Sequence, residues 1–158
     1  LDQGLFYQFL KIMVFDALSG EQDRHEENWG IMRKNGKYQL SPLYDNGCNL
    51  LREFRNESFA LKYYEGSLNF DDYINRSRTW IYKEDGKRYK HFELIKYLYK
   101  VYPNEIRKEI INLNKLTDLK IKSIVNKMPD NIITAKHKEY IIKYINIRKK
   151  ILLGIINM

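Results

Sequence analysis

The sequence predicts a mainly α-helical fold with one small β-hairpin, on three observations. Residues 5–18 have apolar side chains at helical spacing, Asn35-Gly36 separates two short apolar segments, and amphipathic helical patterns fill residues 90–155. The chain has 158 residues, of which 44% are hydrophobic and 30% charged. A chain of this length and composition can bury one sizeable core, so we expect a single globular domain.

The first predicted element is a buried helix at residues 5–18. The segment LFYQFLKIMVFDAL places Phe9 and Met13 at helical spacing, and further apolar residues cover its other faces. A helix that is apolar on every side is usually enclosed by the rest of its domain. We expect it to end at Ser19-Gly20, because glycine favours the C-terminus of a helix.

The second predicted element is a β-hairpin. Asn-Gly between two short apolar segments is a strong hairpin signal, and residues 28–33 and 37–43 are such segments. The strand ends farthest from the turn lie side by side in a two-stranded ladder. Asn28 and Asp45 should therefore be neighbours, with Asp23 carried to the same place by the loop before the hairpin.

The remainder of the chain should be irregular at first and then helical. Residues 46–86 show no long periodic pattern, so we expect only short helical or strand pieces there. Thr117 and Thr134 are the expected N-caps of the last two helices. The predicted helices span residues 90–102, 104–114, 116–128 and 134–155.

The charge of the chain is uneven. Residues 1–85 hold 11 Lys and Arg against 14 Asp and Glu, whereas residues 86–158 hold 17 against 6. The two parts therefore carry −3 and +11, which together give the net charge of +8. Two interpretations of the basic part stay open: solvated helix faces, or a surface that binds nucleic acid or another polyanion.

Cysteine content and hydropathy bear on the compartment. The single cysteine, Cys48, excludes an internal disulfide and suits a reducing environment, so we expect a cytoplasmic protein. No apolar segment approaches the about 20 residues of a membrane-spanning helix, so no membrane span is predicted.

Residues 19–48 contain most of the candidate chemistry, and four explanations compete. A zinc-protease helix fails, because Trp29 stands where the second histidine is needed. An EF-hand fails because the alternating carboxylates and the final glutamate are missing. A plain solvated loop is the third explanation. The fourth is phosphoryl transfer, which needs a carboxylate near the attacking hydroxyl and oxygen ligands for magnesium.

The spacing of polar residues favours phosphoryl transfer. Protein kinases use an aspartate, an asparagine five residues later, and a second aspartate after a short hairpin. Asp23, Asn28 and Asp45 have this order and spacing, with the predicted hairpin between the last two.

Two motifs carry a more specific resemblance. DRHEENWG at residues 23–30, followed by LSPLYDNG at 40–47, resembles the catalytic and metal-binding loops of the HipA-like kinases, the toxin kinases of bacterial toxin–antitoxin systems. Phosphatidylinositol kinases have a similar Asp-Arg-His-x-x-Asn loop, but the Ser-Pro-Leu-Tyr-Asp stretch favours the HipA-like family. The specific match covers roughly residues 5–50.

The resemblance implies the C-terminal lobe of a protein-kinase-like fold, using ATP and Mg²⁺ to phosphorylate a serine or threonine of a protein. The lobe would span residues 1–158, with the catalytic and metal loops within 19–48 and the helical remainder at 86–155. Asp23 matches the catalytic base, and Asn28 and Asp45 match the magnesium ligands. The residues implied to face the nucleotide are His25, Glu26, Glu27, Asn28, Tyr44 and Asp45.

The sequence departs from a complete kinase in one respect. Nothing in it matches a Gly-rich phosphate loop or the strand lysine that grips the phosphates. The resemblance therefore implies an N-terminal lobe upstream of Leu1 or on another polypeptide. Besides the protein substrate, the implied partners are a DNA-binding antitoxin and, through the basic part, nucleic acid. Two alternatives stay open: a degenerate kinase lobe that binds DNA or an antitoxin, and a phosphatidylinositol-type lipid kinase approaching anionic membranes.

Neighbouring side chains carry structural expectations of their own. We expect His25 to act as a hydrogen-bonded strut and Arg24 to pair with Glu21 or Glu27. Trp29 should belong to the core, and Cys48 should fill space as an apolar side chain.

Overall fold

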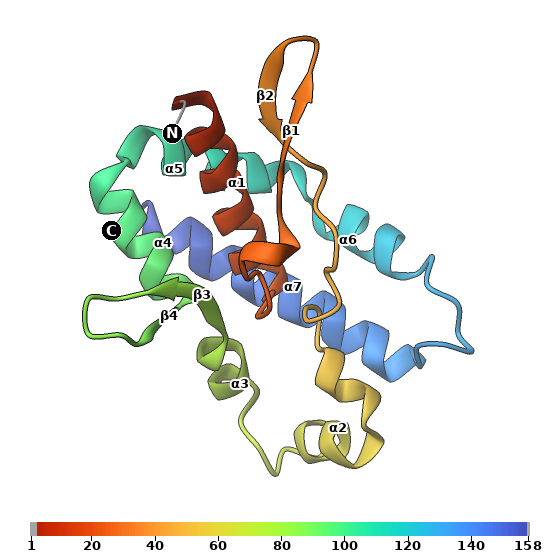
Figure 1. Ribbon diagram of the computed structural model, residues 1–158. Helices are drawn as coiled ribbons and strands as arrows, with labels where there is room; N and C mark the ends of the chain where they lie inside the picture. The colour runs from red at the N-terminus through yellow and green to blue at the C-terminus, as the bar shows by residue number, and fades with distance from the viewer. Residues whose placement is uncertain (1–2, 158) are drawn as a thin grey trace.

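Two long helices form the centre of the fold, which the computed structural model describes for residues 3–157. They are α1 (Gln3–Ser19) and α7 (Ala135–Ile155). Helices α4 (His91–Val101) and α5 (Pro103–Asn112) pack against α1, and α6 (Asp118–Val125) packs against α7 (Figure 1). Residues 1, 2 and 158 of the predicted lobe lie outside the described part.

The helix predicted at residues 5–18 is confirmed as α1, which ends at Ser19. Gly20 follows with φ of +74°. A Cβ atom on Gly20 would lie 1.9 Å from the Tyr144 hydroxyl of α7, so the glycine lets the end of α1 approach α7 closely. The expectation of burial on every side is wrong at Phe15, whose side chain is 41% exposed.

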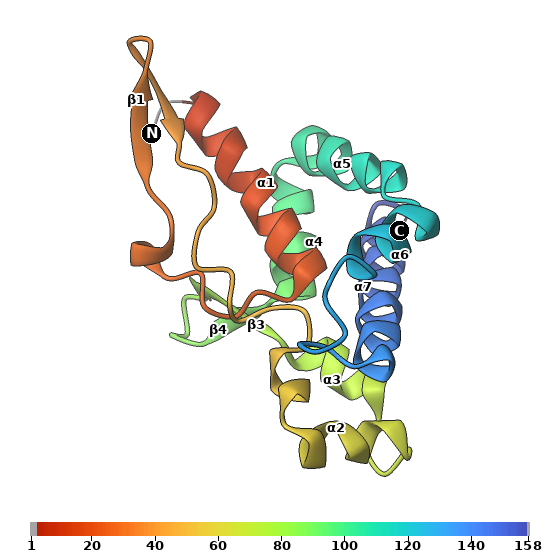
Figure 2. The same cartoon turned by 90° about the vertical axis from the view of Figure 1, so that its right-hand side faces the viewer.

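The predicted hairpin is also confirmed. Strand β1 (Ile31–Lys34) pairs antiparallel with β2 (Lys37–Leu40), from Ile31 opposite Leu40 to Lys34 opposite Lys37. Asn35 and Gly36 have φ of 51° and 77°, as the mirror-image turn of a tight hairpin requires. Figure 2 shows the hairpin projecting from the helical body.

The segment 46–86 is more ordered than predicted. It contains α2 (Glu57–Tyr64), α3 (Phe70–Arg76) and the strand β3 (Arg78–Tyr82), which pairs antiparallel with β4 (Arg88–Lys90). The domain thus has two hairpins among its described residues, not the single one expected. Short 3₁₀ turns complete the element list: η1 (Glu26–Asn28), η2 (Arg52–Arg55) and η3 (Leu113–Lys115).

The threonine caps of the last two helices are confirmed. Thr117 accepts a hydrogen bond from the backbone N–H of Lys120, and Thr134 accepts one from that of His137. Each cap satisfies an N–H group that has no partner within its helix. In the described part of the chain, no helix is both long and apolar enough to cross a membrane.

The core below the loops has an aromatic cluster on one side. On the other side, a buried arginine bonds to residues of several elements. Phe54 lies within 6.2 Å, between ring centroids, of seven other rings, including those of Tyr63, Phe70 and Tyr140. Arg148 of α7 has no exposed surface. Its guanidinium donates to the backbone oxygens of Ala17 and Ile74 and to the Ser77 hydroxyl, each at 2.8 Å. This contact set fixes the end of α1 beneath the loop that carries Asp23.

Candidate active site

Arg24 joins the two loops that contain the candidate residues. Its guanidinium makes a two-pronged ion pair with Asp16 of α1, at 3.1 and 3.2 Å. It also donates to the backbone oxygens of Asn28 and Tyr44, both at 3.0 Å, and to the side-chain oxygen of Asn46. The expected pairing of Arg24 with Glu21 or Glu27 is therefore wrong. Glu27 is exposed, and the buried Glu21 carboxylate instead accepts the backbone N–H of Asp23, so the buried arginine pairs with Asp16.

The amide of Asn28 is oriented by its own loop. Its nitrogen donates to the backbone oxygen of Asp23 at 2.6 Å and lies 3.1 Å from Nε2 of His25. The backbone N–H of Glu27 lies 3.3 Å from the other ring nitrogen of His25. Nδ1 of His25 accepts the Glu27 N–H and caps the η1 turn, while the Nε2 contact places the Asn28 amide against the same ring. His25 is a hydrogen-bonded strut, as expected, and the Asn28 side-chain oxygen accepts no hydrogen bond from the described residues.

The carboxylate of Asp23 is half-buried beside the start of the next segment. The Cys48 thiol lies 3.6 Å from its Oδ2, and its backbone N–H donates to the Glu21 carboxylate at 3.0 Å. Cys48 thus contacts a polar group of the site and does not serve merely as apolar filler. Burial raises the pKa of the Cys48 thiol, so it remains protonated and able to donate.

Asp45 and Tyr44 lie on the exposed side of the site. Asp45 is exposed and adopts a left-handed backbone, with φ of 48°, which aspartate tolerates better than most residues. The Tyr44 ring is 45% exposed, and its hydroxyl donates to the backbone oxygen of Glu27 at 2.9 Å. The Tyr44 hydroxyl bond joins the two segments beyond the end of the strand ladder, which stops at Ile31 and Leu40.

The predicted residues therefore come from two loops that touch. Asn28 contacts Asp23 directly, and Arg24 joins the backbones of Asn28 and Tyr44. Glu26 and Glu27 are exposed in η1, and their carboxylates bond to no described residue. Trp29 is only half-buried and packs on Phe9, with ring centroids 5.2 Å apart. It belongs to the edge of the core, not to its centre.

Two buried carboxylates support the loops from below. Burial raises the pKa of Asp16 to about 6, although the bond to Arg24 opposes the shift. Burial likewise raises the pKa of Glu21, against the N–H donated by Asp23. Both groups belong to the support of the loops, because neither side chain is accessible to a ligand.

The side-chain oxygens of Asn28 and Asp45 suit a cation that is also bound by a ligand. Within residues 3–157, no group of three or more His, Cys, Asp or Glu side chains could hold a metal ion. Mg²⁺ usually binds through one or two protein oxygens and the phosphates of a substrate. One exposed carboxylate and one free amide oxygen, on Asp45 and Asn28, fit that requirement.

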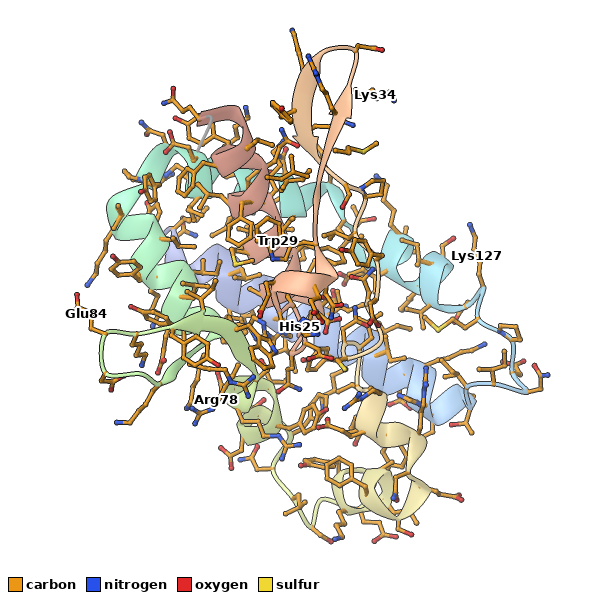
Figure 3. All side chains as sticks on the ribbon, in the orientation of Figure 1. His25, Trp29, Lys34, Arg78, Glu84 and Lys127 are labelled. Carbon is orange, nitrogen blue, oxygen red and sulfur yellow. The ribbon has the colours of Figure 1, made fainter. Side chains whose placement is uncertain are left out.

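One contact of the site was missed by the sequence reasoning. The Trp80 ring of β3 meets the His25 ring edge to face, with centroids 5.6 Å apart. The available signal was Asp85-Gly86, which sits between Tyr82 and Tyr89 in a segment that we expected to be irregular. Figure 3 shows His25 beside the base of this second hairpin.

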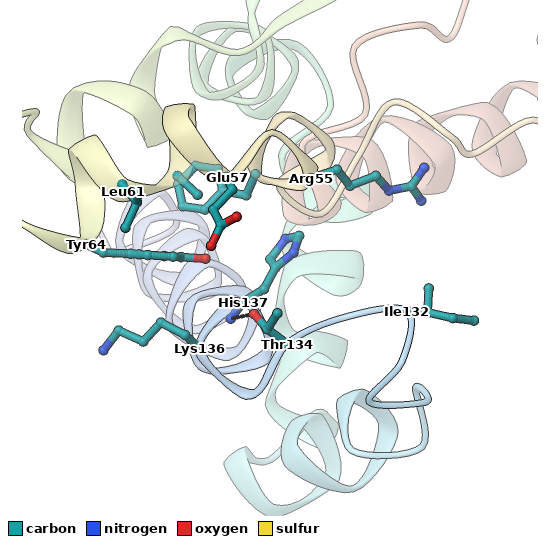
Figure 4. A pocket seen from close by; sticks show the side chains of 10 residues that line it. Arg55, Glu57, Leu61, Tyr64, Ile132, Thr134, Lys136 and His137 are labelled. Atoms are coloured by element: carbon teal, nitrogen blue, oxygen red, sulfur yellow. Dashed lines mark hydrogen bonds between the residues drawn. The ribbon is translucent and has the colours of Figure 1, made fainter.

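A separate cavity lies away from these loops. It encloses about 740 Å³ between α2, the loop before α7 and the first turn of α7. Figure 4 shows Arg55 and Lys136 pointing away from His137, so the charged groups around this cavity do not converge on one point. The loops around Asp23 remain the site with organised chemistry.

The fold and the two joined loops define a kinase-like C-terminal lobe. A family model described as the HipA-like C-terminal domain matches residues 2–118, and the chain belongs to that family. No curated protein sequence matches the chain. The crystal structure of a Helicobacter pylori proinflammatory kinase, CtkA, is similar with a TM-score of 0.76 at 20% sequence identity. The similarity covers 99% of this chain and 56% of that kinase, so the chain spans little more than half of its length.

Proposed function

We propose that the chain is the catalytic lobe of a protein serine/threonine kinase that uses ATP and Mg²⁺. The observation that carries the proposal is the Arg24 network. One buried guanidinium bonds to α1, to the Asn28 backbone and to the Tyr44 backbone. It thereby joins the two loops that carry Asp23, Asn28 and Asp45, and these residues have the order and spacing of kinase loops.

The residues divide into two roles. Asp23 orients the acceptor hydroxyl and takes its proton, and the nearby Cys48 thiol restrains its carboxylate. The Asn28 amide oxygen and the Asp45 carboxylate hold Mg²⁺, which neutralises charge on the transferred phosphoryl group. An amide and a carboxylate together carry one negative charge, so they can share a cation without strong mutual repulsion.

The face beside the site would receive a nucleotide-binding lobe. Ile31, Met32 and Tyr38 of the first hairpin are exposed, as is Tyr44. Exposed apolar side chains in one neighbourhood mark a surface that a partner covers. The second lobe would come from sequence upstream of Leu1 or from another polypeptide, and it would bring the phosphate-gripping lysine.

Three substitutions test the roles in the protein that carries both lobes. Asp23→Asn should leave magnesium–ATP binding nearly intact and reduce phosphoryl transfer by a factor of about 10³ or more, because an amide cannot take the proton. Asp45→Asn and Asn28→Ala should weaken magnesium-dependent ATP binding itself. Calorimetric titration with ATP and transfer of labelled phosphate to protein measure the two effects.

Magnesium concentration separates the roles further. Raising it should partly restore transfer in Asp45→Asn and Asn28→Ala, because their defect is weaker binding of the ion. It should restore nothing in Asp23→Asn. Transfer by Asp23→Asn at the parent rate would show that this residue is not the base.

A further inference from the structure

The second hairpin, β3–β4, contacts the catalytic loop at His25. This histidine follows Asp23 by two residues. Trp80 meets His25 edge to face at 5.6 Å, and the guanidinium of Arg88 lies over the Trp80 ring, 5.0 Å from its centroid. Figure 3 shows Arg78 at the base of the hairpin, near His25, and Glu84 at its distant tip. The end of the hairpin nearest the site is therefore the basic end.

The charges of this hairpin are incompletely balanced. Lys83 pairs with Glu93 at 2.9 Å, and Lys87 pairs with Asp85 at 3.3 Å. Neither Arg78 nor Arg88 forms an ion pair with any carboxylate of residues 3–157. Two positive side chains beside the catalytic loop thus lack a counter-charge.

The strand register adds an independent observation. Arg78 of β3 stands directly opposite Lys90 of β4. Like charges at directly opposed positions destabilise a strand pair. The Glu93 carboxylate accepts the Lys90 backbone N–H and offsets part of this repulsion, and an anionic group bound at Arg78 would remove the rest, so the hairpin base is complementary to a negatively charged ligand.

We propose that the β3–β4 hairpin recognises an acidic segment of the acceptor protein, with Arg78 at its base and Arg88 over the Trp80 ring as specificity-determining residues. The proposal rests on the proposed kinase function and names its substrate class: a serine or threonine flanked by glutamate or aspartate. An acceptor must bring its hydroxyl to Asp23, so its flanking residues must cover the adjacent surface. A polypeptide is favoured over nucleic acid because this surface is a few side chains wide, whereas phosphate backbones are bound by longer basic tracks.

The test measures peptide binding to the 158-residue chain without ATP. The probes are a short fluorescein-labelled peptide with one serine flanked by glutamates and a second in which glutamines replace the glutamates. Fluorescence anisotropy should show about fivefold tighter binding of the glutamate peptide, the upper range for exposed charge pairs. Arg78→Glu should remove this preference and favour a lysine-flanked peptide instead.

The matched control is Lys127→Glu, which makes the same charge change at an exposed lysine far from the hairpin (Figure 3). It should keep the preference for glutamate, because the recognition is local and not due to net charge. Arg78→Gln, checked for native folding by circular dichroism, should lose the preference without reversing it.

Three results would overturn the proposal. One is equal binding of the two peptides, and another is an equal loss in Lys127→Glu and Arg78→Glu. The third is tighter binding of single-stranded RNA than of the acidic peptide, abolished by Arg78→Glu, which would assign the surface to nucleic acid. Phosphoryl transfer is measured separately. A protein that binds the peptide through Arg78 but never transfers phosphate would contradict the kinase function and leave the acidic-segment site standing.

Discussion

The loops of the site and the helical base beneath them each contain one buried arginine, but the two arginines are stabilised differently. Arg24 in the loops is paired with a buried carboxylate, that of Asp16. Arg148 in the base has no carboxylate partner among the described residues. It is held by carbonyl and hydroxyl oxygens, and its guanidinium lies 4.6 Å and 5.1 Å from the ring centroids of Phe92 and Tyr144.

This difference indicates how each region is maintained. The loops have little apolar burial, so polar contacts centred on Arg24 fix their shape. The base has a large apolar core, and Arg148 serves to satisfy backbone groups where three helices meet. Substitution of Arg24 should therefore disturb the site more than the fold, whereas substitution of Arg148 should destabilise the whole domain.

The largest expected effect is that of Arg148→Met. The substitution leaves the backbone oxygens of Ala17 and Ile74 buried without the guanidinium donor, whereas the Ser77 hydroxyl keeps its contact with Nδ1 of His91. At about 1–3 kcal/mol for each unpaired group, less the desolvation of the guanidinium that is avoided, the free energy of unfolding should fall by about 4 kcal/mol. Urea unfolding measures this change. The control Lys150→Met, at an exposed position of the same helix, should change it by less than about 0.5 kcal/mol.

The next effect is that of Arg24→Met, which should cost about 3 kcal/mol near neutral pH because Asp16 is left buried without its partner. Removing Arg24 also removes the main influence that lowers the pKa of Asp16, so this pKa should rise above its value of about 6. Protonation would then neutralise Asp16, and acidification should restore part of the lost stability. Arg148→Met has no such carboxylate and should show no such recovery. An identical pH response in both variants would contradict the comparison.

Local signals in the sequence were enough to predict much of this structure. The Asp23–Asn28–Asp45 spacing, the Asn35-Gly36 turn and the threonine caps each depend on residues close in the chain. The partner of Arg24 could not be predicted in this way. Asp16 lies within a helix that looks apolar throughout, and only the folded structure brings its carboxylate beneath the loop.

The second hairpin shows a different limit of prediction from the sequence. Its Asp85-Gly86 turn was visible in the sequence, but its strands pair irregularly, with a register shift between Arg78 and Tyr82. A bulged pair lacks the strict alternation that predicts a strand. Its contact with His25 is a tertiary event, which no local pattern encodes.

The boundary between the two regions is tested by Gly20→Ala. Gly20 has a positive φ, and its new methyl group would meet the buried Tyr144 ring, which cannot swing aside. The backbone strain and the overlap together should cost about 2–3 kcal/mol. Gly36→Ala is the matched control, because it has the same backbone strain with nothing within 4 Å of the methyl group, and it should cost about 1 kcal/mol. Equal losses in the two variants would mean that α1 and α7 can separate freely at this point.

The smallest expected effect concerns pH and His91, a buried residue of the base whose Nδ1 lies 3.0 Å from the Ser77 hydroxyl. Burial, assisted by the charge of Arg148, lowers the pKa of His91 from 6.5 to about 3. The unfolded chain therefore binds a proton that the folded chain does not, so this contribution to stability is lost as pH falls from about 6.5 towards 3.

Asp16 acts in the opposite direction, since its raised pKa adds stability as pH falls from about 6 towards 4. His91→Gln removes the His91 contribution and leaves the other titrating groups, Asp16 among them, in place, so the variant should gain stability relative to the parent by about 2 kcal/mol between about pH 7 and about pH 5. Urea unfolding of both proteins at the two pH values measures the difference, and parallel pH profiles would show that His91 takes up a proton as readily in the folded domain as in the unfolded chain.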